Sequence, residues 1–541
     1  MECAPERAAK PSFREYALTA VEDDAAVPAG TGTALLPSGS REISGASARW
    51  IDRLLVAEVL VPLALTLVYL ARIAGFVFRR MWFDELFTYY VAQQPSLARL
   101  MEALYRVDLN PPLNYLLVRW AQAVLGTSEA VARLPAVLGF YFGSMGVFWV
   151  LRRRIGPYWS AAAILMFWST PYFRYATQAR PYGILLGFFA LSLVAYDHAG
   201  AETPRQWPIF ALFGGNLGMM LSHVFAPLSI LPFCAAEAVR CVMRRRFDWR
   251  IWASLLLPLV ISPAYISATH NFQSIYFPAK YQASTMQVVY YFVRLAMLYP
   301  FPALFGVLAC AFAAGLFWRA QDKRESVGWA GLACAAVLLL APLLLNIALM
   351  KSGGAFWERY CIPSAICFYG LLAMGAARLT GYRRASAIAA AIALGVVTLH
   401  STDFPDSEVP LPGQNELIRR DLPLVAGSGL TFLEMDRYES DEFLSRLYYL
   451  VDRNAAIQYA HSTIFENFPL LTHYFPIRAH VEPYGPFVAA HPHFLVITKG
   501  DYLEAWILRK LGADGASVRL VQKLHGPGNR PYGIYEIQCR L

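Results

Sequence analysis

The sequence predicts an α-helical membrane protein with many spanning helices and a small α/β domain at its C-terminus. Of its 541 residues, 57% are hydrophobic and only 16% are charged, which is too apolar for an ordinary soluble protein. The mean hydropathy is +0.39. Long apolar runs separated by short basic clusters continue to about residue 400, where a mixed polar sequence begins. Lipid is therefore the expected environment of most of the chain.

The net charge of +9 does not indicate a nucleic-acid partner. The basic residues stand in short clusters between apolar runs, where the preference of Lys and Arg for cytoplasmic loops explains them. Six of the eight cysteines lie in or beside apolar segments at no metal-ligand spacing, so neither a disulfide framework nor a zinc site is indicated. Residues 1–50 lack the apolar core of a signal peptide and are expected to form a disordered cytoplasmic tail.

Residues 51–400 are expected to form the transmembrane domain, because a helix needs roughly 20 mostly apolar residues to cross the hydrocarbon core. About eleven runs qualify, at 54–78, 134–151, 158–174, 181–198, 207–224, 226–242, 250–268, 288–318, 327–350, 356–377 and 385–400.

A further short apolar run at 111–126 carries Arg119 and Gln122 near its middle. Whether it spans the membrane decides on which side every later loop lies. If this run does not span, a cytoplasmic N-terminus places all four basic clusters inside, as the positive-inside rule requires. These clusters are Arg152–Arg154, Arg244–Arg246, Arg319 with Lys323 and Arg324, and Arg378 with Arg383 and Arg384. We therefore expect 111–126 to be an interfacial or re-entrant helix in a first external loop, 79–133.

The same loop is expected to contain a second interfacial helix. Leu97, Leu100, Met101 and Leu104 have helical spacing and follow Ser96, a suitable N-cap. Two such helices would line a vestibule at the level of the lipid headgroups.

Residues 401–541 are expected to form a small extracytoplasmic α/β domain. Strand-like runs occur at 429–435, 493–498, 517–523 and 533–538, and helix-like runs occur at 441–452 and 502–511.

Two acids, Asp84 and Glu85, follow the first span among aromatic residues in WFDELFTYY. Partial desolvation there can hold a carboxylate ready to act as a base. The alternative is an acidic pair that only marks the start of a helix. Further along the loop, Asp108 and Asn110 precede two prolines, where Asn110 is equally well explained as a helix cap.

Basic and aromatic residues cluster at the other predicted outer ends. YFRYATQARPYG contains Arg174, for which snorkelling to headgroups is favoured, and then Arg180 and Tyr182. Arginine can bind a lipid phosphate through several charge-assisted hydrogen bonds, which favours this role for Arg180. His223 ends the fifth span, and a lone histidine there is more often structural than catalytic.

One site with an anion-binding part and a carboxylate base is the resulting hypothesis. Its candidate residues come from separate segments that the topology places on one side of the membrane at similar depth. They are Asp84, Glu85, Asp108, Arg180, His223, Lys351 and Arg359.

At these residues the chain resembles the polytopic glycosyltransferases of the C-type fold, which take a sugar from a polyprenyl-phosphate carrier. That superfamily includes protein O-mannosyltransferases, aminoarabinose transferases that act on lipid A, and enzymes that modify lipopolysaccharide cores. The likeness covers about residues 50–380, and Asn110 departs from it where the family commonly has histidine. The matching pieces are WFDE at Trp82, NPPLNYLL at Asn110, TSEAVARLP at Thr127, QARPYG at Gln178, SHVF at Ser222 and ERYCIPS at Glu358.

The resemblance implies an inverting sugar transfer from a polyprenyl-phosphate-linked donor, such as an undecaprenyl phosphate sugar, to a glycan, lipid or protein acceptor outside a bacterial plasma membrane. Asp84 would be the base, and Arg180 and Arg359 would stabilise the departing phosphate, helped by Tyr182, His223 or Lys351. Glu85 would position the acceptor or a metal, so a divalent metal is left open. Asp108, Asn110 and Tyr89 would position the acceptor or the loop, and the tyrosine rings would stack on sugars.

Two alternatives come from other classes. A transporter or lipid flippase would also have many spans, but the sequence shows few ionisable residues at the midplane and no pair of broken helices in corresponding halves. A non-catalytic scaffold would leave the charges of the external loops unexplained.

Overall fold

The computed structural model describes residues 40–108, 110–199, 206–265, 283–295, 328–352, 354–401, 421–499, 506–526 and 530–539. The chain divides into two compact units, Met1–Val56 and Ala57–Leu541. Helix α1, Ser40–Ala74, begins upstream of the expected first span, and most of the predicted disordered tail lies outside the described residues. All candidate site residues belong to the second unit.

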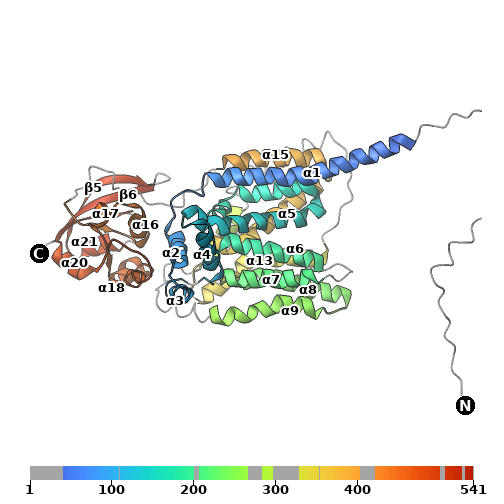
Figure 1. The fold of residues 1–541 in the computed structure, drawn as a ribbon. Helices are drawn as coiled ribbons and strands as arrows, with labels where there is room; N and C mark the ends of the chain where they lie inside the picture. The colour runs from blue at the N-terminus through green and yellow to red at the C-terminus, as the bar shows by residue number, and fades with distance from the viewer. Residues whose placement is uncertain are drawn as a thin grey trace, which may run out of the picture. The chain divides into compact units, whose positions relative to one another are not determined.

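Apolar helices make up the membrane part (Figure 1), and several of them lie side by side, including α5 with α6 and α8 with α13. After α1 the bounds are α5 Glu129–Trp168, α6 Tyr182–Ala199, α7 Trp207–Ser222, α8 Pro227–Arg244, α9 Trp249–Leu256, η2 Leu257–Ile261, α11 Thr285–Val293, α13 Trp329–Ser352, α14 Ile362–Leu379 and α15 Arg384–His400.

The predicted helical membrane fold is confirmed, and the number of spans stays a prediction. Among the described residues, five helices are long and apolar enough to cross a membrane. These are Ala57–Ala74, Glu129–Trp168, Tyr182–Ala199, Trp329–Ser352 and Glu358–Leu379. The expected spans at 250–268 and 288–318 lie partly outside the described residues.

Helix α5 covers all of the predicted span 134–151 and the predicted span 158–174 as far as Trp168. The helical path breaks at Gly156, whose φ of 78° lies in the left-handed region that glycine enters without a steric cost. Pro157 follows and cannot continue the hydrogen bonding of the preceding turn. The two parts of α5 therefore behave as two helices joined by a sharp turn.

Glycines allow α5 and α6 to approach closely. A Cβ atom added at Gly139 would lie 2.6 Å from the carbonyl oxygen of Gly183, and one added at Gly187 would lie 2.9 Å from the carbonyl oxygen of Gly139. Small residues bring helix backbones together in this way in membranes. Because Gly183 directly follows Tyr182, this packing also fixes the segment that carries Arg180.

The first loop folds into three helices, α2 Phe83–Ala92, α3 Leu97–Val107 and α4 Leu113–Leu125. Ser96 is the N-cap of α3, since its side chain accepts a hydrogen bond from the Arg99 N–H at 3.1 Å. The two helices predicted within this loop are therefore present as α3 and α4. Helix α2 begins at the acidic pair, so these acids also mark a helix start, as the alternative interpretation proposed.

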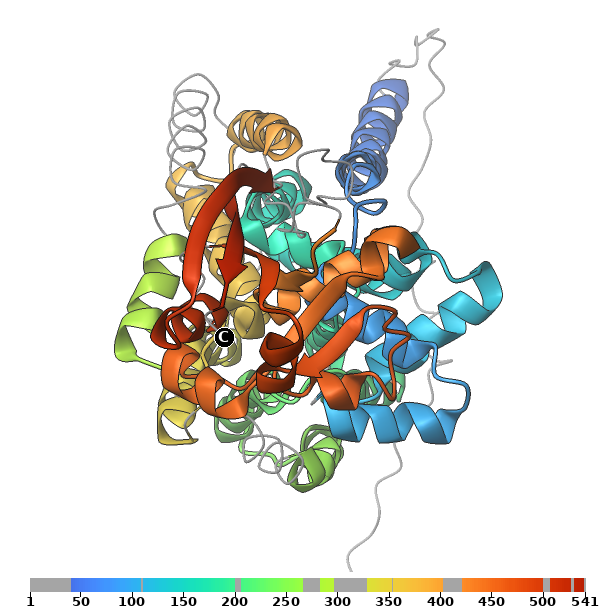
Figure 2. The same ribbon diagram turned by 90° about the vertical axis from the view of Figure 1, so that its left-hand side faces the viewer.

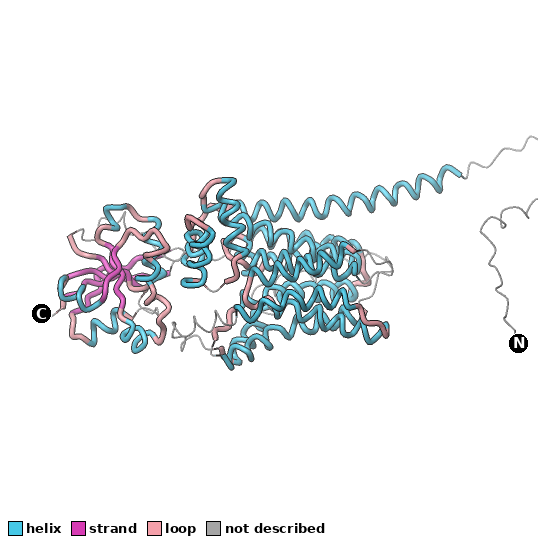
Figure 3. The backbone as a smooth tube through the Cα atoms, turned by 60° about the horizontal axis from the view of Figure 1, so that its bottom comes forward, coloured by secondary structure: helices cyan, strands magenta, loops and turns pink. Residues whose placement is uncertain are grey.

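The C-terminal region is the predicted α/β domain, and the described strands gather there (Figure 3). Its sheet has six strands in the order β3-β2-β1-β4-β6-β5; β3, β2, β1 and β4 are parallel, and β6 is antiparallel to β4 and β5. The orange and red ribbons of this domain face the viewer in Figure 2. The strands are β1 Leu424–Ala426, β2 Leu447–Val451, β3 His480–Pro483, β4 His493–Thr498, β5 Ser517–Gly526 and β6 Arg530–Gln538. The helices are α16 Gly429–Tyr438, α17 Asp441–Leu444, α18 Arg453–Ala455, η7 Ala456–Ala460, α19 Phe468–Leu471, α20 Tyr484–Ala490 and α21 Ile507–Ala513.

Two element predictions in this domain were wrong. The strand expected at 429–435 is helix α16, which starts at the N-cap Ser428. The helix expected at 441–452 ends at Leu444 and is followed by β2, whose run LYYLV pairs with β1 and β3. Short apolar runs fit both periodicities, and pairing with neighbouring strands decides between them. The other three strands are confirmed, and the described part of 502–511 contains α21.

The C-terminal domain contacts α2 directly. The Phe83 ring lies 5.5 Å from that of Phe465, and the Phe87 ring lies 4.9 Å from that of Phe475. The end of α2 is also held, since Gln94 Nε2 donates to the Tyr474 carbonyl at 2.6 Å. The domain therefore helps to set the position of the helix that carries Asp84.

Glu466 gives this domain a pH-dependent stability. Burial raises the pKa of Glu466 from 4.5 to about 7, although its carboxylate accepts hydrogen bonds from Trp506 Nε1 and the Asp452 N–H. The folded state then binds more protons than the unfolded state between these two values, so stability is fully present below about pH 4.5 and falls as the pH rises through about 7.

Replacement of Glu466 by glutamine should therefore remove part of the loss of stability between pH 5 and pH 8. The effect is a few kcal/mol at most, because one pKa unit corresponds to about 1.4 kcal/mol. Thermal unfolding in detergent at both pH values measures it, with the exposed Glu442→Gln as the matched control. An equal pH dependence in both variants would refute the assignment.

Candidate functional site

Four charged side chains from four separate segments meet in what we call the charged cluster: Asp84, Asp108, Arg180 and Arg359. Asp84 Oδ2 lies 3.3 Å from Arg359 Nη1 and 4.0 Å from Arg180 Nη2. Asp108 Oδ2 lies 3.4 Å from Arg180 Nη1. The sequence suggested that these residues converge, and the structure brings them together.

Asp84 lies in the first turn of α2, where the positive end of the helix dipole favours a carboxylate. Its side chain is 21% exposed, so it is partly accessible while it faces the arginines. Arg180 Nη1 also donates to the Asp84 carbonyl oxygen at 3.1 Å, which ties the start of α2 to the segment before α6.

Glu85 has a different environment from its neighbour, because it is fully buried and both of its oxygens are occupied. Arg133 donates Nε to Oε1 at 2.8 Å and Nη2 to Oε2 at 2.9 Å, and the Ala179 N–H donates to Oε1 at 2.8 Å. Glu85 thus links α2 to α5 and to the residue before Arg180. These contacts fit a positioning residue rather than the catalytic residue that the sequence suggested.

Asp108 is held in place by its neighbours. Asn110 Nδ2 donates to Oδ1 at 2.9 Å, and the Tyr115 hydroxyl donates to Oδ2. Burial, followed by the charge of Asp108, raises the pKa of Tyr115 well above its usual value, so the phenol stays protonated. The N-cap of α4 is Pro112, so Asn110 is not the helix cap of the alternative interpretation; it orients Asp108.

The two arginines have hydrogen-bond donors to spare. The Nε atoms of Arg180 and Arg359 are buried, and within the described part of the chain they have no hydrogen-bond partner. Burial alone would lower the pKa of Arg180, but Asp84 and Asp108 raise it well above its usual value, so this guanidinium stays charged. Buried donors without partners are costly, and an anion bound here would satisfy them.

An aromatic wall stands beside Arg359. The guanidinium carbon of Arg359 lies 5.8 Å from the centroid of the Tyr182 ring, and the His223 ring lies 5.5 Å from Tyr182 and 5.4 Å from Tyr360. His223 Nδ1 accepts the Phe225 N–H at 3.1 Å. Tyr182 and His223 therefore border the cluster, as the sequence suggested.

Two predicted site residues are not brought to the cluster. Lys351 is exposed in the last turn of α13, and among the described residues no hydrogen bond or ion pair joins it to the four charged side chains. The Tyr89 hydroxyl donates to the Thr127 carbonyl at 2.7 Å, and its ring packs under Arg437 of the C-terminal domain. Tyr89 therefore belongs to the contact between the loop and the domain, and stacking on a sugar is not supported.

Arg133 and Tyr115 also belong to the site, although the sequence did not predict them. Arg133 lies in the quoted motif TSEAVARLP near the start of an apolar helix, where a charged residue is rare enough to suggest a buried partner. Nothing in the sequence signals which acid it pairs with.

The cluster does not fit a divalent cation. In the described ranges no three acidic, histidine or cysteine side chains stand close enough to hold a metal ion. Asp84 and Asp108 both face the guanidinium of Arg180, so a cation between them would meet a positive charge.

No protein-family model and no curated protein matches the chain. Among solved structures, it is similar to ArnT from Cupriavidus metallidurans bound to undecaprenyl phosphate, with 13% identity and a TM-score of 0.49 over 88% of this chain and 97% of that one. The apo form of the same protein gives 12% identity and a TM-score of 0.49 over 90% and 98%.

Proposed function

We propose that the protein is a membrane glycosyltransferase that moves a sugar from a polyprenyl-phosphate carrier to an acceptor outside the cytoplasm. The observation that carries the proposal is the partly open carboxylate of Asp84 beside two arginines whose buried Nε–H groups lack partners in the described chain. A base next to an anion-binding site is what transfer from a phosphate-linked donor needs.

The reaction is a single displacement with inversion. Asp84 accepts the proton from a hydroxyl or amine of the acceptor as that group bonds to the anomeric carbon of the sugar. The bond between this carbon and the phosphate oxygen breaks, and both of its electrons leave with the polyprenyl phosphate. Arg180 and Arg359 stabilise the negative charge that develops on this oxygen.

Without a donor, the ion pair with Arg359 stabilises the charged form of Asp84 and makes it a weaker base. Phosphate binding draws Arg359 toward the donor and weakens its hold on Asp84, which then becomes a better proton acceptor. Arg180 stays in place, because Asp108 and the Asp84 carbonyl hold its Nη1.

The transporter alternative needs ionisable groups along a path through the membrane centre. The charged cluster instead lies at helix ends, with Asp84 in the first turn of α2, Asp108 at the end of α3, and Arg359 in η5, Glu358–Cys361, directly before α14. This placement favours a reaction at the membrane surface.

The direct test is sugar transfer by the purified protein in detergent, with a panel of labelled polyprenyl-phosphate sugars as donors and a membrane extract as acceptor. Incorporated label would establish the transferase and name its donor. Inactivity across the panel, with intact folded protein, would reject the proposal and favour transport.

Replacement of Arg359 by methionine should weaken binding of unglycosylated polyprenyl phosphate by about 10- to 100-fold, as expected for the loss of one charge-assisted interaction. Arg359→Lys should recover part of the affinity, because the charge returns without the planar fork. Direct binding in detergent measures both. Arg378→Met, an exposed arginine at the far end of α14, is the matched control and should bind normally. Equal affinity of Arg359→Met and this control would contradict the phosphate assignment.

A further inference from the structure

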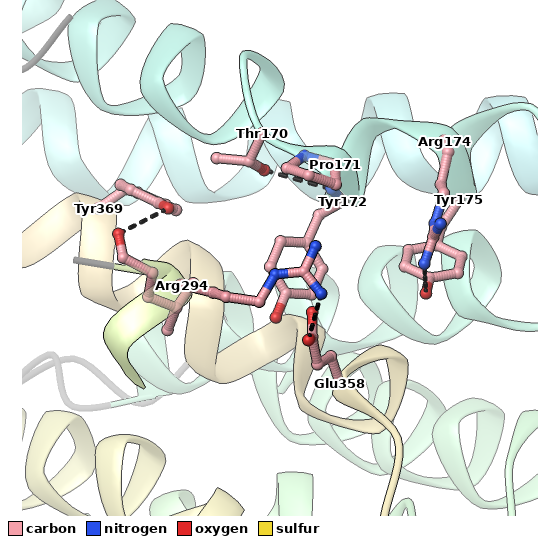
Figure 4. Close-up of a pocket in the computed structure, with 9 residues that line it drawn as sticks. Thr170, Pro171, Tyr172, Arg174, Tyr175, Arg294, Glu358 and Tyr369 are labelled. Carbon is pink, nitrogen blue, oxygen red and sulfur yellow. Dashed lines mark hydrogen bonds and ion pairs between the residues drawn. The ribbon is translucent and has the colours of Figure 1, made fainter. Parts of the chain in front are cut away.

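An ion pair lies one residue away from the charged cluster. Glu358 directly precedes Arg359 in η5, and its Oε1 atom lies 2.7 Å from Nη1 of Arg294, the residue that follows α11 (Figure 4). Each of the two paired side chains is 26% exposed. A carboxylate and its counter-charge therefore stand next to the arginine to which the carrier phosphate is assigned.

The backbone around η5 is held by contacts that do not involve this ion pair. The Tyr291 hydroxyl of α11 donates to the Cys361 carbonyl at 3.3 Å. The Tyr369 hydroxyl of α14 donates to the Leu295 carbonyl, also at 3.3 Å (Figure 4). The turn also continues directly into α14, which begins at Ile362. We therefore expect η5 to keep its position when the ion pair is broken.

The charge of Glu358 matters more than the contribution of its ion pair to stability. An ion pair that is partly exposed to water usually stabilises the folded state only slightly. A carboxylate without a counter-charge, by contrast, repels an anion bound nearby and attracts a neighbouring guanidinium. Because Asp84 already lies 3.3 Å from Arg359, a second uncompensated carboxylate would make this arginine less available to a phosphate.

We propose that Arg294 is a positioning residue for donor binding, which neutralises Glu358 and thereby keeps Arg359 available for the carrier phosphate. This assignment rests on the proposed glycosyltransferase function, in which Arg359 binds that phosphate. Loss of Arg294 leaves a negative charge beside the phosphate site, whereas loss of Glu358 leaves a positive charge there. The two losses should therefore have opposite effects on carrier binding.

The test measures the Kd of unglycosylated polyprenyl phosphate in a non-ionic detergent. Arg294→Met should weaken binding by about 10-fold at low ionic strength, as expected for one charge interaction near the protein surface. Arg294→Lys should restore the affinity, because lysine returns the positive charge. Glu358→Gln should bind at least as tightly as wild type, and the double variant Arg294→Met with Glu358→Gln should recover most of the lost affinity.

Salt and a control variant separate the effect of charge from a change of structure. High ionic strength should reduce the difference in Kd between Arg294→Met and wild type, because salt screens interactions between partly exposed charges. A change in the shape of the site would not respond to salt in this way. Asp197→Asn, which breaks the ion pair of Asp197 with Arg154 at 2.7 Å elsewhere in the bundle, is the matched control and should leave the Kd unchanged.

The outcomes separate this proposal from the one on which it rests. If Glu358→Gln weakened carrier binding as strongly as Arg294→Met, the pair would act through the shape of η5, and the proposal would be overturned. Wild-type affinity in Arg294→Met would also overturn it, and either result would leave the transferase standing. A wild type that binds no polyprenyl phosphate would overturn the proposed function itself, and this inference with it.

Discussion

Replacement of Asp84 by asparagine is expected to lower sugar transfer by about 100- to 10,000-fold, the usual contribution of a positioned general base. Asparagine keeps the size of the side chain and an oxygen that can still face Arg359, which lies 3.3 Å from Asp84 in the structure. It cannot accept the proton of the acceptor, so kcat should fall while donor affinity changes little. Initial rates of label transfer, combined with direct binding of unglycosylated carrier, measure the two effects separately.

The matched control is again Asp197→Asn, since this aspartate is also paired with arginines but lies at the end of α6. Near-normal turnover in Asp84→Asn would reject Asp84 as the base. A variant that lost carrier binding as strongly as turnover would indicate that Asp84 acts by holding the arginines in place.

The sequence located most of the charged cluster because its members follow from topology. Asp84, Arg180 and Arg359 stand at the predicted outer ends of different spans, and a common depth was enough to suggest that they meet. The direction in which each side chain points within a turn could not be predicted in this way. Asp84 and Glu85 are neighbours, yet one faces the cluster and the other pairs with Arg133, because successive residues of a helix point in different directions.

The two candidate residues that the structure does not bring to the charged cluster show the same difficulty. Tyr89 and Lys351 lie close in sequence to other candidate residues, but Lys351 is exposed and Tyr89 contacts a residue far away in the chain. Tyr89 receives a hydrogen bond from Arg437 at 3.3 Å, and nothing in a loop sequence announces a partner in a separate domain. The fold class could be predicted because a helix that crosses lipid needs a long run of apolar residues, which is easily recognised in a sequence. The runs at 429–435 and 441–452 are too short to distinguish a helix from a strand.

Helix α2 emerges as the element on which the site depends. Its first turn carries Asp84, its buried face carries Glu85, and its Phe83 and Phe87 rings pack on the C-terminal domain. A change on any of these faces would move the base relative to the arginines. Even a small movement of the base matters, because a shift of about 1 Å in a catalytic group can lower a rate by about 100-fold.

Replacement of Arg133 by methionine should therefore give a large loss of stability. Both Arg133 and Glu85 side chains are 0% exposed, and Arg133 Nη1 also donates to the Val77 carbonyl at 2.7 Å. Removing the arginine leaves the Glu85 carboxylate buried without its counter-charge, which costs about 3–5 kcal/mol. Thermal unfolding in detergent, with Arg154→Met as a control ion pair that is partly exposed, measures the loss.

The double variant Arg133→Met with Glu85→Gln tests the cause. Removal of the uncompensated charge should make it more stable than Arg133→Met alone, even though the hydrogen bonds of Arg133 to the carbonyls that follow α1 stay lost. Because Glu85 Oε1 also accepts the Ala179 N–H next to Arg180, both variants should lose turnover in addition to stability. A double variant no more stable than the single one would show that Arg133 stabilises the protein through the backbone carbonyls and not through its ion pair with Glu85.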